Sequence, residues 1–160
     1  MAPRERTCYE RACALLALRP HFRQELAAKL ARRGYPPAEL EAALDRLGRQ
    51  GYLDDAAAAR GLVAARLARG GLGRDRLRAD LERRGAAPAA VAAALDELPA
   101  DELPAAREAA SRWHGKNAAA LARHLARKGF TRRAIFAVLK EHPTAADSAG
   151  DGEAALDDPD

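Results

Sequence analysis

The sequence predicts an all-α fold: an elongated, curved array of three tandem three-helix repeats, followed by a disordered acidic C-terminal tail. Ala, Leu, Arg and Glu dominate the 160 residues, and β-branched residues are scarce, which favours helix over strand. Aromatic residues make up only 4% of the chain, too few for one large core. A pattern of Leu and Gly residues recurs three times, and small helical units of this kind must stack to bury their apolar faces.

The repeated pattern has five apolar or Gly positions at constant spacing. It begins at Leu26, Leu77 and Leu121, so that successive copies start 51 and 44 residues apart. Apolar residues follow the first Leu at +4, +14 and +18, and Gly follows at +8: Leu30, Leu40, Leu44 and Gly34; Leu81, Val91, Leu95 and Gly85; Leu125, Ile135, Leu139 and Gly129. Leu residues four apart mark one face of a helix, and Gly suits the left-handed position that ends it. Each copy is therefore a helix, a Gly turn and a second helix that packs on the first.

A further helix precedes each pair. Its apolar positions are spaced by three and four residues: Cys8, Ala12, Leu15 and Leu16; Ala59, Leu62, Val63 and Leu67; Ala106, Ala109, Ala110 and Trp113. Asp54 and Asp101 are the expected N-caps of the second and third of these helices. Thr131 is the expected N-cap of the last helix, and Pro37 and Pro88 suit the first turns of their helices. The expected divisions are 1–53, 54–98 and 99–142 for the repeats and 143–160 for the tail.

Charge is unevenly distributed along the chain. The net charge is +4, but residues 143–160 hold six acidic residues and no Lys or Arg, so residues 1–142 carry +10. This balance suggests a polyanionic or acidic partner, although a well-solvated surface is the simpler interpretation. The tail could compete with such a partner for the basic body, or could only aid solubility.

Cysteine usage and hydropathy indicate the compartment. Cys8 and Cys13 are five residues apart, which is not the C-x-x-C spacing of redox or zinc sites, so a reduced cytoplasm is expected. No apolar run approaches the length that spans a membrane, and no signal peptide is recognisable at the start.

Three segments resemble the RecX family in order and spacing. They are Gly51-Tyr52-Leu53-Asp54-Asp55; Gly71-Leu72-Gly73-Arg74 with Leu77, Leu81, Arg84 and Gly85; and Lys128-Gly129-Phe130-Thr131 with Ile135. The resemblance covers residues 9–142. It implies a cytoplasmic, non-enzymatic regulator that binds RecA and its filament on single-stranded DNA, and that inhibits or modulates the recombinase, ATPase and coprotease activities. It implies no catalytic residues and no cofactor.

Basic side chains recur at positions +6 and +7 of every repeat. At 100° per residue, those at position +7 (Arg33, Arg84 and Lys128) lie above the apolar stripe, where they are expected to be structural and to complement the helix C-terminus. Those at position +6 point away from the core, where partner contact and simple solvation are both open: Arg32, Arg83 and Arg127. Regular spacing of such side chains suits a partner that itself repeats, because weak linked contacts add up.

The third repeat is the expected filament-facing or DNA-facing end. Residues 99–142 hold nine basic and four acidic residues. With Arg74 from the central motif, the candidate contacts here are Lys116, Arg123, Arg132 and Arg133. Asp54 and Asp55 are expected to cap and begin a helix rather than bind metal, and Tyr52 and Leu53 to pack between repeats.

Two other functions compete with the RecA regulator. The first is non-specific DNA binding; sequence-specific reading by the second helices is disfavoured, since 38–47 and 88–98 offer few Arg, Asn or Gln side chains. The second is a helical scaffold for another protein. An enzyme is not expected, because the sequence has no nucleophile–base pair, phosphate loop or metal cluster. A monomer is expected.

Overall fold

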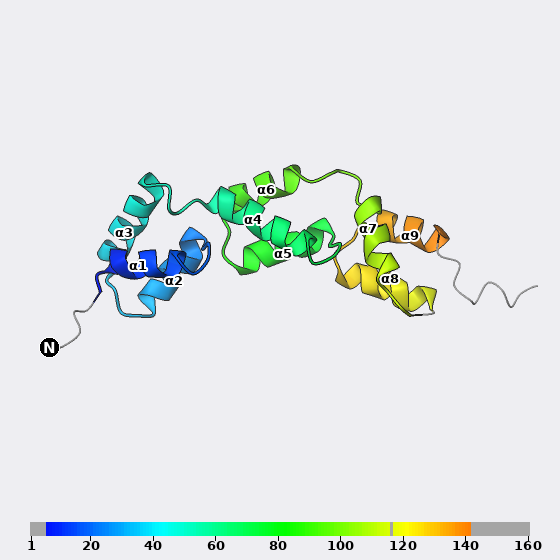
Figure 1. Cartoon of the computed structure of the whole chain (residues 1–160), viewed down its shortest axis with the longest axis horizontal. Coiled ribbons are helices and arrows are strands. Elements are labelled where there is room, and N and C mark those ends of the chain that lie inside the picture. Colours follow the sequence, from blue (N-terminus) through cyan, green and yellow to red (C-terminus); the bar gives the residue numbers. More distant parts are fainter. Residues whose placement is uncertain (1–5, 116, 142–160) are drawn as a thin grey trace, which may run out of the picture. The chain divides into compact units, whose positions relative to one another are not determined.

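The computed structural model describes residues 6–115 and 117–141, and within them all regular secondary structure is helical (Figure 1). The described part contains nine helices and no strand, as predicted: α1 (Cys8–Leu16), α2 (Arg23–Ala31), α3 (Pro37–Arg49), α4 (Asp55–Leu67), α5 (Arg74–Arg83), α6 (Pro88–Asp96), α7 (Leu103–Ser111), α8 (Ala118–Arg127) and α9 (Arg132–Glu141). We refer to α1–α3, α4–α6 and α7–α9 as the first, second and third repeats, and to α2, α5 and α8 as the middle helices.

The predicted turns and helix starts are present. Gly34, Gly85 and Gly129 follow the middle helices with φ of 86°, 83° and 80°, the left-handed conformation that ends a helix without cost only at Gly. Pro37 and Pro88 open α3 and α6. The order of caps, turns and apolar positions in the sequence thus sets where helices begin and end.

Two of the three predicted side-chain caps are confirmed. The Asp54 carboxylate accepts a hydrogen bond from the Ala57 amide at 2.9 Å, and the Thr131 hydroxyl accepts one from the Ala134 amide at 3.4 Å. The prediction for Asp101 is wrong by one position: Glu102 is the residue before α7, and its side chain does not cap that helix. Asp101 instead accepts a hydrogen bond from the Leu103 amide at 3.0 Å.

The first and third repeats each close around a core of their own. In the first, α1, α2 and α3 pack on one another around Leu26, Leu30 and Leu44, all with no exposed surface. In the third, α7, α8 and α9 enclose Leu121, Leu125 and Val138. In the second repeat, α4 packs on α6, and the buried residues include Leu77, Leu81, Val91 and Leu95.

The buried face of α9 differs from the prediction. Ile135 and Leu139, expected in the core, are only partly buried, whereas Ala134 and Val138 are 5% and 0% exposed. The buried stripe of α9 is therefore centred nearer Ala134 and Val138 than the sequence predicts, and Ile135 and Leu139 pack at its edge. Ala-rich α7 provides the reason, because its Ala106, Ala109 and Ala110 leave room for the backbone of α9 to come close.

The contacts divide the chain into two units. One comprises Met1–Arg69 with Leu77–Pro99, and the other comprises Gly70–Arg76 with Ala100–Asp160. The boundary falls within α5. The predicted boundaries between repeats therefore stay predictions, and the tail at 143–160 lies outside the described residues.

Candidate binding surface on the middle helices

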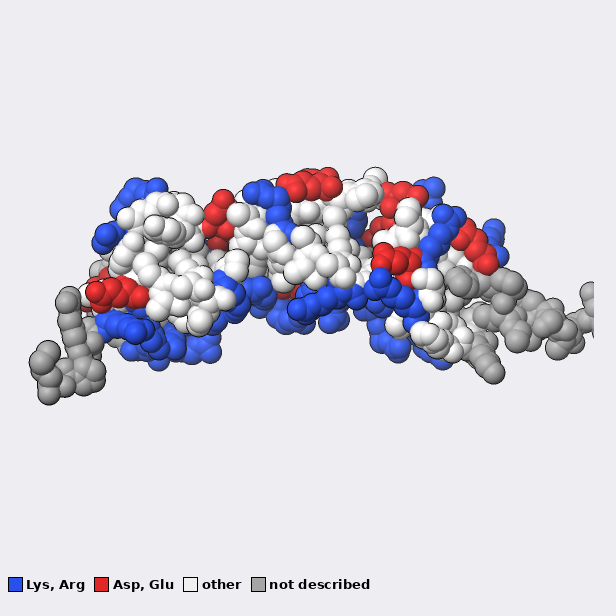
Figure 2. Space-filling view, viewed as in Figure 1, with Lys and Arg blue, Asp and Glu red and all other residues white. Residues whose placement is uncertain are grey.

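Basic side chains are concentrated on the middle helices and their Gly turns. Segments 23–34, 74–85 and 118–129 hold twelve Lys or Arg residues and four Asp or Glu residues. In Figure 2, Lys and Arg atoms gather over α2 and α5 and, in the other unit, over α8, while acidic atoms lie near α6 and the start of α7. The middle helix with its Gly turn thus carries the largest excess of basic side chains in each repeat.

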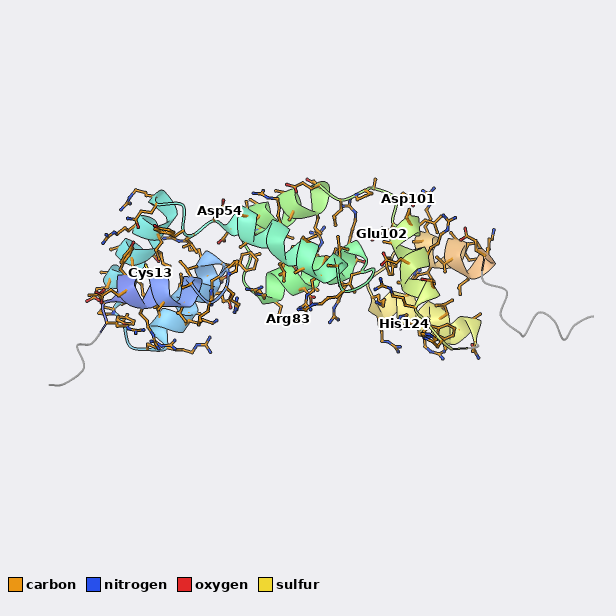
Figure 3. The ribbon with its side chains drawn as sticks, viewed as in Figure 1. Cys13, Asp54, Arg83, Asp101, Glu102 and His124 are labelled. Carbon is orange, nitrogen blue, oxygen red and sulfur yellow. The ribbon has the colours of Figure 1, made fainter. Side chains whose placement is uncertain are left out.

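The basic side chains at position +6 lie at the surface, as predicted. Arg32 is exposed, and its Nε donates a hydrogen bond to the Ala28 carbonyl at 3.3 Å. Arg127 is also exposed. Arg83, labelled in Figure 3, donates from Nη2 to an Asp80 carboxylate oxygen at 2.6 Å, yet its side chain is 62% exposed. All three guanidinium groups are open to a partner, and their role in binding stays a prediction.

Asp80 is a residue that sequence reasoning missed. It is 2% exposed and lies between two arginines, with its second carboxylate oxygen 3.0 Å from Nε of Arg66 on α4. A buried carboxylate needs such partners, since burial alone would favour its neutral form. The sequence did contain one signal of this burial, because Asp80 stands three positions after Leu77 and so lies on the apolar stripe of α5. Asp80 therefore ties α5 to α4 and holds Arg83 in place at the surface.

Two of the three basic side chains at position +7 bind the preceding repeat. Arg84 donates from Nη2 to the Pro20 carbonyl at 3.0 Å, and the Lys128 ammonium donates to the Gly71 carbonyl at 3.2 Å. Both accepting carbonyls belong to the turn after a repeat's first helix. The sequence predicted that these side chains complement the C-terminus of their own helix. Arg33 does so through the Lys29 carbonyl at 3.2 Å, whereas Arg84 and Lys128 are structural through contacts with the preceding repeat that the sequence did not predict.

Glu25 forms the centre of a charged cluster on α2. Its carboxylate contacts Arg19, the Lys29 ammonium at 3.1 Å and Arg84 Nη2 at 3.2 Å. Burial opposes its ionisation, but the hydrogen bonds from these three cations prevail and lower the pKa of Glu25 from 4.5 to about 2. The carboxylate is therefore charged throughout the physiological range and joins the first repeat to Arg84 of the second.

His21 lies next to this cluster and is 3% exposed. Its Nδ1 is 2.9 Å from the Arg19 carbonyl and its Nε2 is 2.9 Å from the Lys29 ammonium, so the neutral ring donates to the first and accepts from the second. Burial is the main cause that lowers the pKa of His21. The ring is thus a neutral bridge in the packing of the first repeat.

Acidic side chains at the start of one repeat cap a middle helix of the preceding repeat. Asp55 accepts a hydrogen bond from the Arg23 amide at 2.8 Å, at the start of α2. Glu102 accepts one from the Arg74 amide at 2.8 Å, at the start of α5, and another from the Thr131 amide at 3.0 Å. Figure 3 labels Asp54 at the start of α4, and Asp101 and Glu102 at the start of α7. The paired acids are thus structural, and each pair both starts its own repeat and holds the preceding one.

The remaining motif residues divide between core and surface. Gly51 has a φ of 74°, and Leu53 is 9% exposed, as its predicted packing requires. The prediction that Tyr52 packs between repeats is wrong, because its side chain is 66% exposed. The turn at Gly51 directs Leu53 inward and leaves Tyr52 in solvent, since adjacent residues of an extended segment face opposite ways.

The candidate residues of the third repeat do not form one cluster. Arg123 lies on α8, whereas Arg132 and Arg133 open α9; all three are exposed. Arg74 is half-buried, and its amide is held by Glu102. Lys116 lies outside the described residues. Arg123 and Arg127, four positions apart on α8, are the pair that shares a helix face.

The described residues contain no metal cluster and no membrane helix. No group of three or more His, Cys, Asp or Glu side chains among them could hold a metal ion, and both cysteines are free thiols. No helix in residues 6–115 and 117–141 has the length and apolar character needed to cross a bilayer. Burial raises the pKa of the Cys8 thiol, which keeps it neutral within the first core.

The fold and its charged surface define a class: helical-repeat proteins with basic helices at their surface. Comparison with known proteins gives the family. The profile described as "RecX, first three-helix domain" matches residues 8–47. The chain is 37% identical over 127 residues to the regulatory protein RecX of Halorhodospira halophila, which covers 75% of this chain and 78% of that protein. The chain belongs to the RecX family of regulatory proteins.

Further relatives agree in sequence and in fold. The regulatory protein RecX of Xanthomonas oryzae pv. oryzae is 35% identical over 147 residues, with 88% of this chain and 91% of that protein covered. The crystal structure of RecX from Lactobacillus salivarius superposes with a TM-score of 0.73 at 17% identity, covering 84% of this chain and 93% of that one. The helical fold of the family is therefore the fold of this chain.

Proposed function

We propose that this protein binds RecA and the RecA filament on single-stranded DNA, and that it inhibits or modulates the recombinase, ATPase and coprotease activities. Membership of the RecX family of regulatory proteins carries the proposal. The basic middle helices support it, because a filament of protein on DNA offers acidic groups at regular intervals. The protein acts as a cytoplasmic monomer, without catalysis or a cofactor of its own.

The surface proposed to face the filament is the exposed side of the middle helices. Its contacts are Arg32, Arg83 and Arg127, together with Arg123 on α8. The exposed Arg132 and Arg133 at the start of α9 are proposed as separate additional contacts. Arginine suits this task, since its planar guanidinium group can bind a carboxylate or phosphate with two hydrogen bonds.

RecA ATPase on single-stranded DNA, with this protein added below one copy per RecA, tests the proposal. A regulator of the filament inhibits at such ratios, and its effect does not depend on free DNA. If inhibition requires an excess of this protein over RecA, and the amount required rises with the amount of free DNA, the protein is a competitor for DNA and the proposal is wrong.

A charge variant tests the proposed surface. Arg32→Glu and Arg127→Glu reverse two exposed charges, whereas Arg83→Gln is the better change at the third position, because Glu there would face the buried Asp80 carboxylate. We expect the inhibitory potency to fall at least about tenfold, the equivalent of about 1.4 kcal/mol.

A matched control makes the same change in net charge at positions away from the middle helices. It combines Arg49→Glu, Arg69→Glu and Lys140→Gln, three exposed positions outside the middle helices and their turns. Its potency should stay within about twofold of the unaltered protein. Equal loss in both variants would show a general charge effect and would refute the choice of surface.

Non-specific DNA binding is the second candidate function, and the concentration of cations on the middle helices favours it. Binding of this kind weakens steeply with salt, because phosphate contacts release counterions. A steep salt dependence for DNA alone, with no effect on RecA at physiological salt, would support this alternative.

A further inference from the structure

The Gly turns of the second and third repeats dock onto the preceding repeat in the same way. Arg84 donates to the Pro20 carbonyl and to Glu25, as described above, and its guanidinium lies 5.4 Å from the ring centroid of Phe22. Gly85 follows directly, and a Cβ added there would lie 3.4 Å from Gln24. The Arg84–Gly85 turn therefore contacts a main-chain carbonyl, a carboxylate and the N-terminal end of α2.

The corresponding turn of the third repeat receives the same kind of segment. Lys128 donates to the Gly71 carbonyl, and a Cβ added at Gly129 would lie 2.3 Å from the Arg76 amide nitrogen. Backbone packs directly on backbone here, since the Gly73 amide also donates to the Lys128 carbonyl at 2.9 Å. Gly71 stands 51 positions after the Pro20 of the first junction, which is the spacing of the repeat itself. The docking surface is thus used twice.

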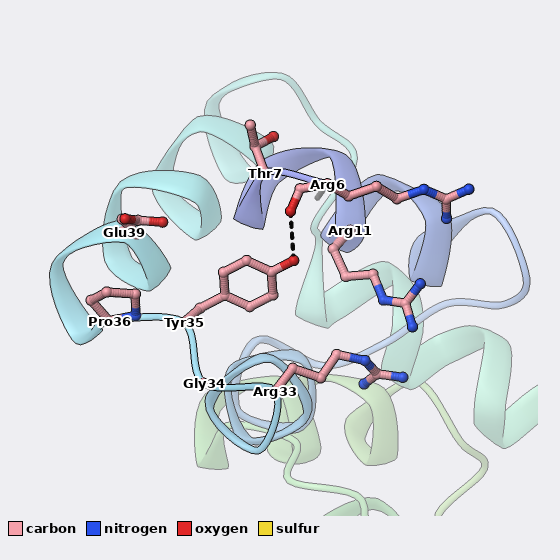
Figure 4. A pocket seen from close by; sticks show the side chains of 8 residues that line it. All are labelled: Arg6, Thr7, Arg11, Arg33, Gly34, Tyr35, Pro36 and Glu39. Carbon is pink, nitrogen blue, oxygen red and sulfur yellow. Dashed lines mark hydrogen bonds between the residues drawn. The ribbon is translucent and has the colours of Figure 1, made fainter. Parts of the chain in front are cut away.

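The first repeat carries the same turn, and none of the described residues fills it. Arg33 and Gly34 occupy the positions of Arg84 and Gly85, but a Cβ added at Gly34 would have no atom within 4 Å. An open pocket of about 590 Å³ lies there instead. Figure 4 shows this pocket around the Tyr35 ring, whose hydroxyl donates to the Arg6 carbonyl at 2.7 Å.

The charge of the pocket indicates what it accepts. Arg6, Arg11 and Arg33 line it, and their side chains extend on one side of the Tyr35 ring, whereas Glu39 lies on the other (Figure 4). Within the described part of the chain, no carboxylate pairs with these three arginines, in contrast to Glu25 beside Arg84. The pocket is thus complementary to a segment with more acidic character than the ones that fill the two other turns.

We propose that this turn of the first repeat is a docking site for an acidic helical segment of a partner protein. The segment presents a main-chain carbonyl to Arg33 and one or more carboxylates to Arg6 and Arg11, and its backbone packs on Gly34. Protein is favoured over nucleic acid because both filled copies of the surface hold polypeptide backbone against the Gly. The site is separate from the exposed side of the middle helices, so the inference does not depend on RecA binding.

The test uses the full chain and a short Ala-rich helical peptide that carries several Glu side chains. In an amide NMR titration we expect the Gly34 signal to shift, while Gly85 and Gly129 stay in place because their turns are already filled. A peptide with Gln in place of every Glu should bind at least about tenfold more weakly. Equal shifts at all three glycines, or equal affinity for the two peptides, would overturn the proposal.

Variants separate the pocket from general charge attraction. Arg11→Glu with Arg33→Glu should weaken peptide binding at least about tenfold, whereas Arg49→Glu with Arg69→Glu, two exposed positions with the same change in net charge, should stay within about twofold. Helical circular dichroism confirms that both variants are folded. If the first pair weakens binding of a single-stranded oligonucleotide but not of the peptide, the site binds nucleic acid and the proposal is wrong. If the peptide shifts Gly34 only after residues 143–160 are deleted, the chain's own tail is the occupant, which also overturns it.

Discussion

Replacement of Glu25 by Gln should destabilise the first two repeats by about 2 kcal/mol at neutral pH, because a buried, paired charge is lost. The substitution keeps the shape of the side chain but leaves Arg19, Lys29 and Arg84 around a neutral group. A pKa lowered from 4.5 to about 2 corresponds to about 3 kcal/mol, at about 1.4 kcal/mol per pKa unit. Solvent screening reduces this figure, because the Arg19 side chain is 43% exposed, and about 2 kcal/mol remains.

The lowered pKa of Glu25 also predicts how its contribution to stability depends on pH. Because the folded-state pKa of Glu25 is lowered, its stabilisation is fully present above the unfolded value of 4.5 and is lost as the pH falls toward about 2. The difference between the two proteins should therefore be largest at neutral pH and should shrink across this acidic window. Urea unfolding, followed by far-ultraviolet circular dichroism at several pH values, measures it.

A control substitution distinguishes this cluster from an ordinary surface ion pair. Glu108 pairs with Arg112 at 2.8 Å, but both side chains are at least half exposed, so Glu108→Gln should cost about 0.5 kcal/mol or less. If Glu25→Gln costs no more than Glu108→Gln at neutral pH, or if its cost does not change with acid, the reasoning about the cluster is refuted.

Three further substitutions and one titration check the packing. Gly73→Ala should cost about 1–3 kcal/mol of stability, because the new Cβ would lie 1.9 Å from the Gly129 carbonyl oxygen. Gly61→Ala should instead stabilise the protein by about 0.5–1 kcal/mol, because a Cβ there has no atom within 4 Å and Ala favours helix over Gly. Equal thermal midpoints for the two variants would contradict both expectations. Asp55→Ala should cost about 1–2 kcal/mol and speed hydrogen exchange of the amide that it caps at the start of α2; unchanged exchange would disprove the cap. Because the pKa of His21 is lowered in the folded protein, the unfolded chain binds the proton more readily. Stability should therefore fall as the pH drops below about 6.5. A His21 ring that titrates normally by NMR would disprove its buried neutral state.

Spacing along the chain was sufficient to predict the helices. Leucines four residues apart, glycines at +8 and prolines at helix starts are local signals, and each one constrains only the few residues around it. The same signals located the exposed Arg32, Arg83 and Arg127, because the direction of a side chain on a helix follows from its position relative to the apolar stripe. The family resemblance rested on the same short segments.

Other features could not be read from spacing because they depend on partners distant in the chain. Asp55 looks like a first-turn acid, but its partner is the Arg23 amide, 32 residues earlier. The Glu102 carboxylate accepts a hydrogen bond from the Arg74 amide, 28 residues earlier, rather than capping its own helix α7. The buried Asp80 was missed for the same reason, because Arg66, with which it pairs, lies on another helix.

The sequence by itself determined the nine described helices, their order and the basic character of the middle ones, since helix formation and side-chain direction are local properties of the chain. Only the tertiary structure decided which polar groups meet across a junction, which face of α9 is buried, and that the turn at Gly34 is open while its two counterparts are filled. These features depend on the close packing of backbones and on the pairing of charges between separate helices, and neither is encoded in the neighbouring residues of any one helix.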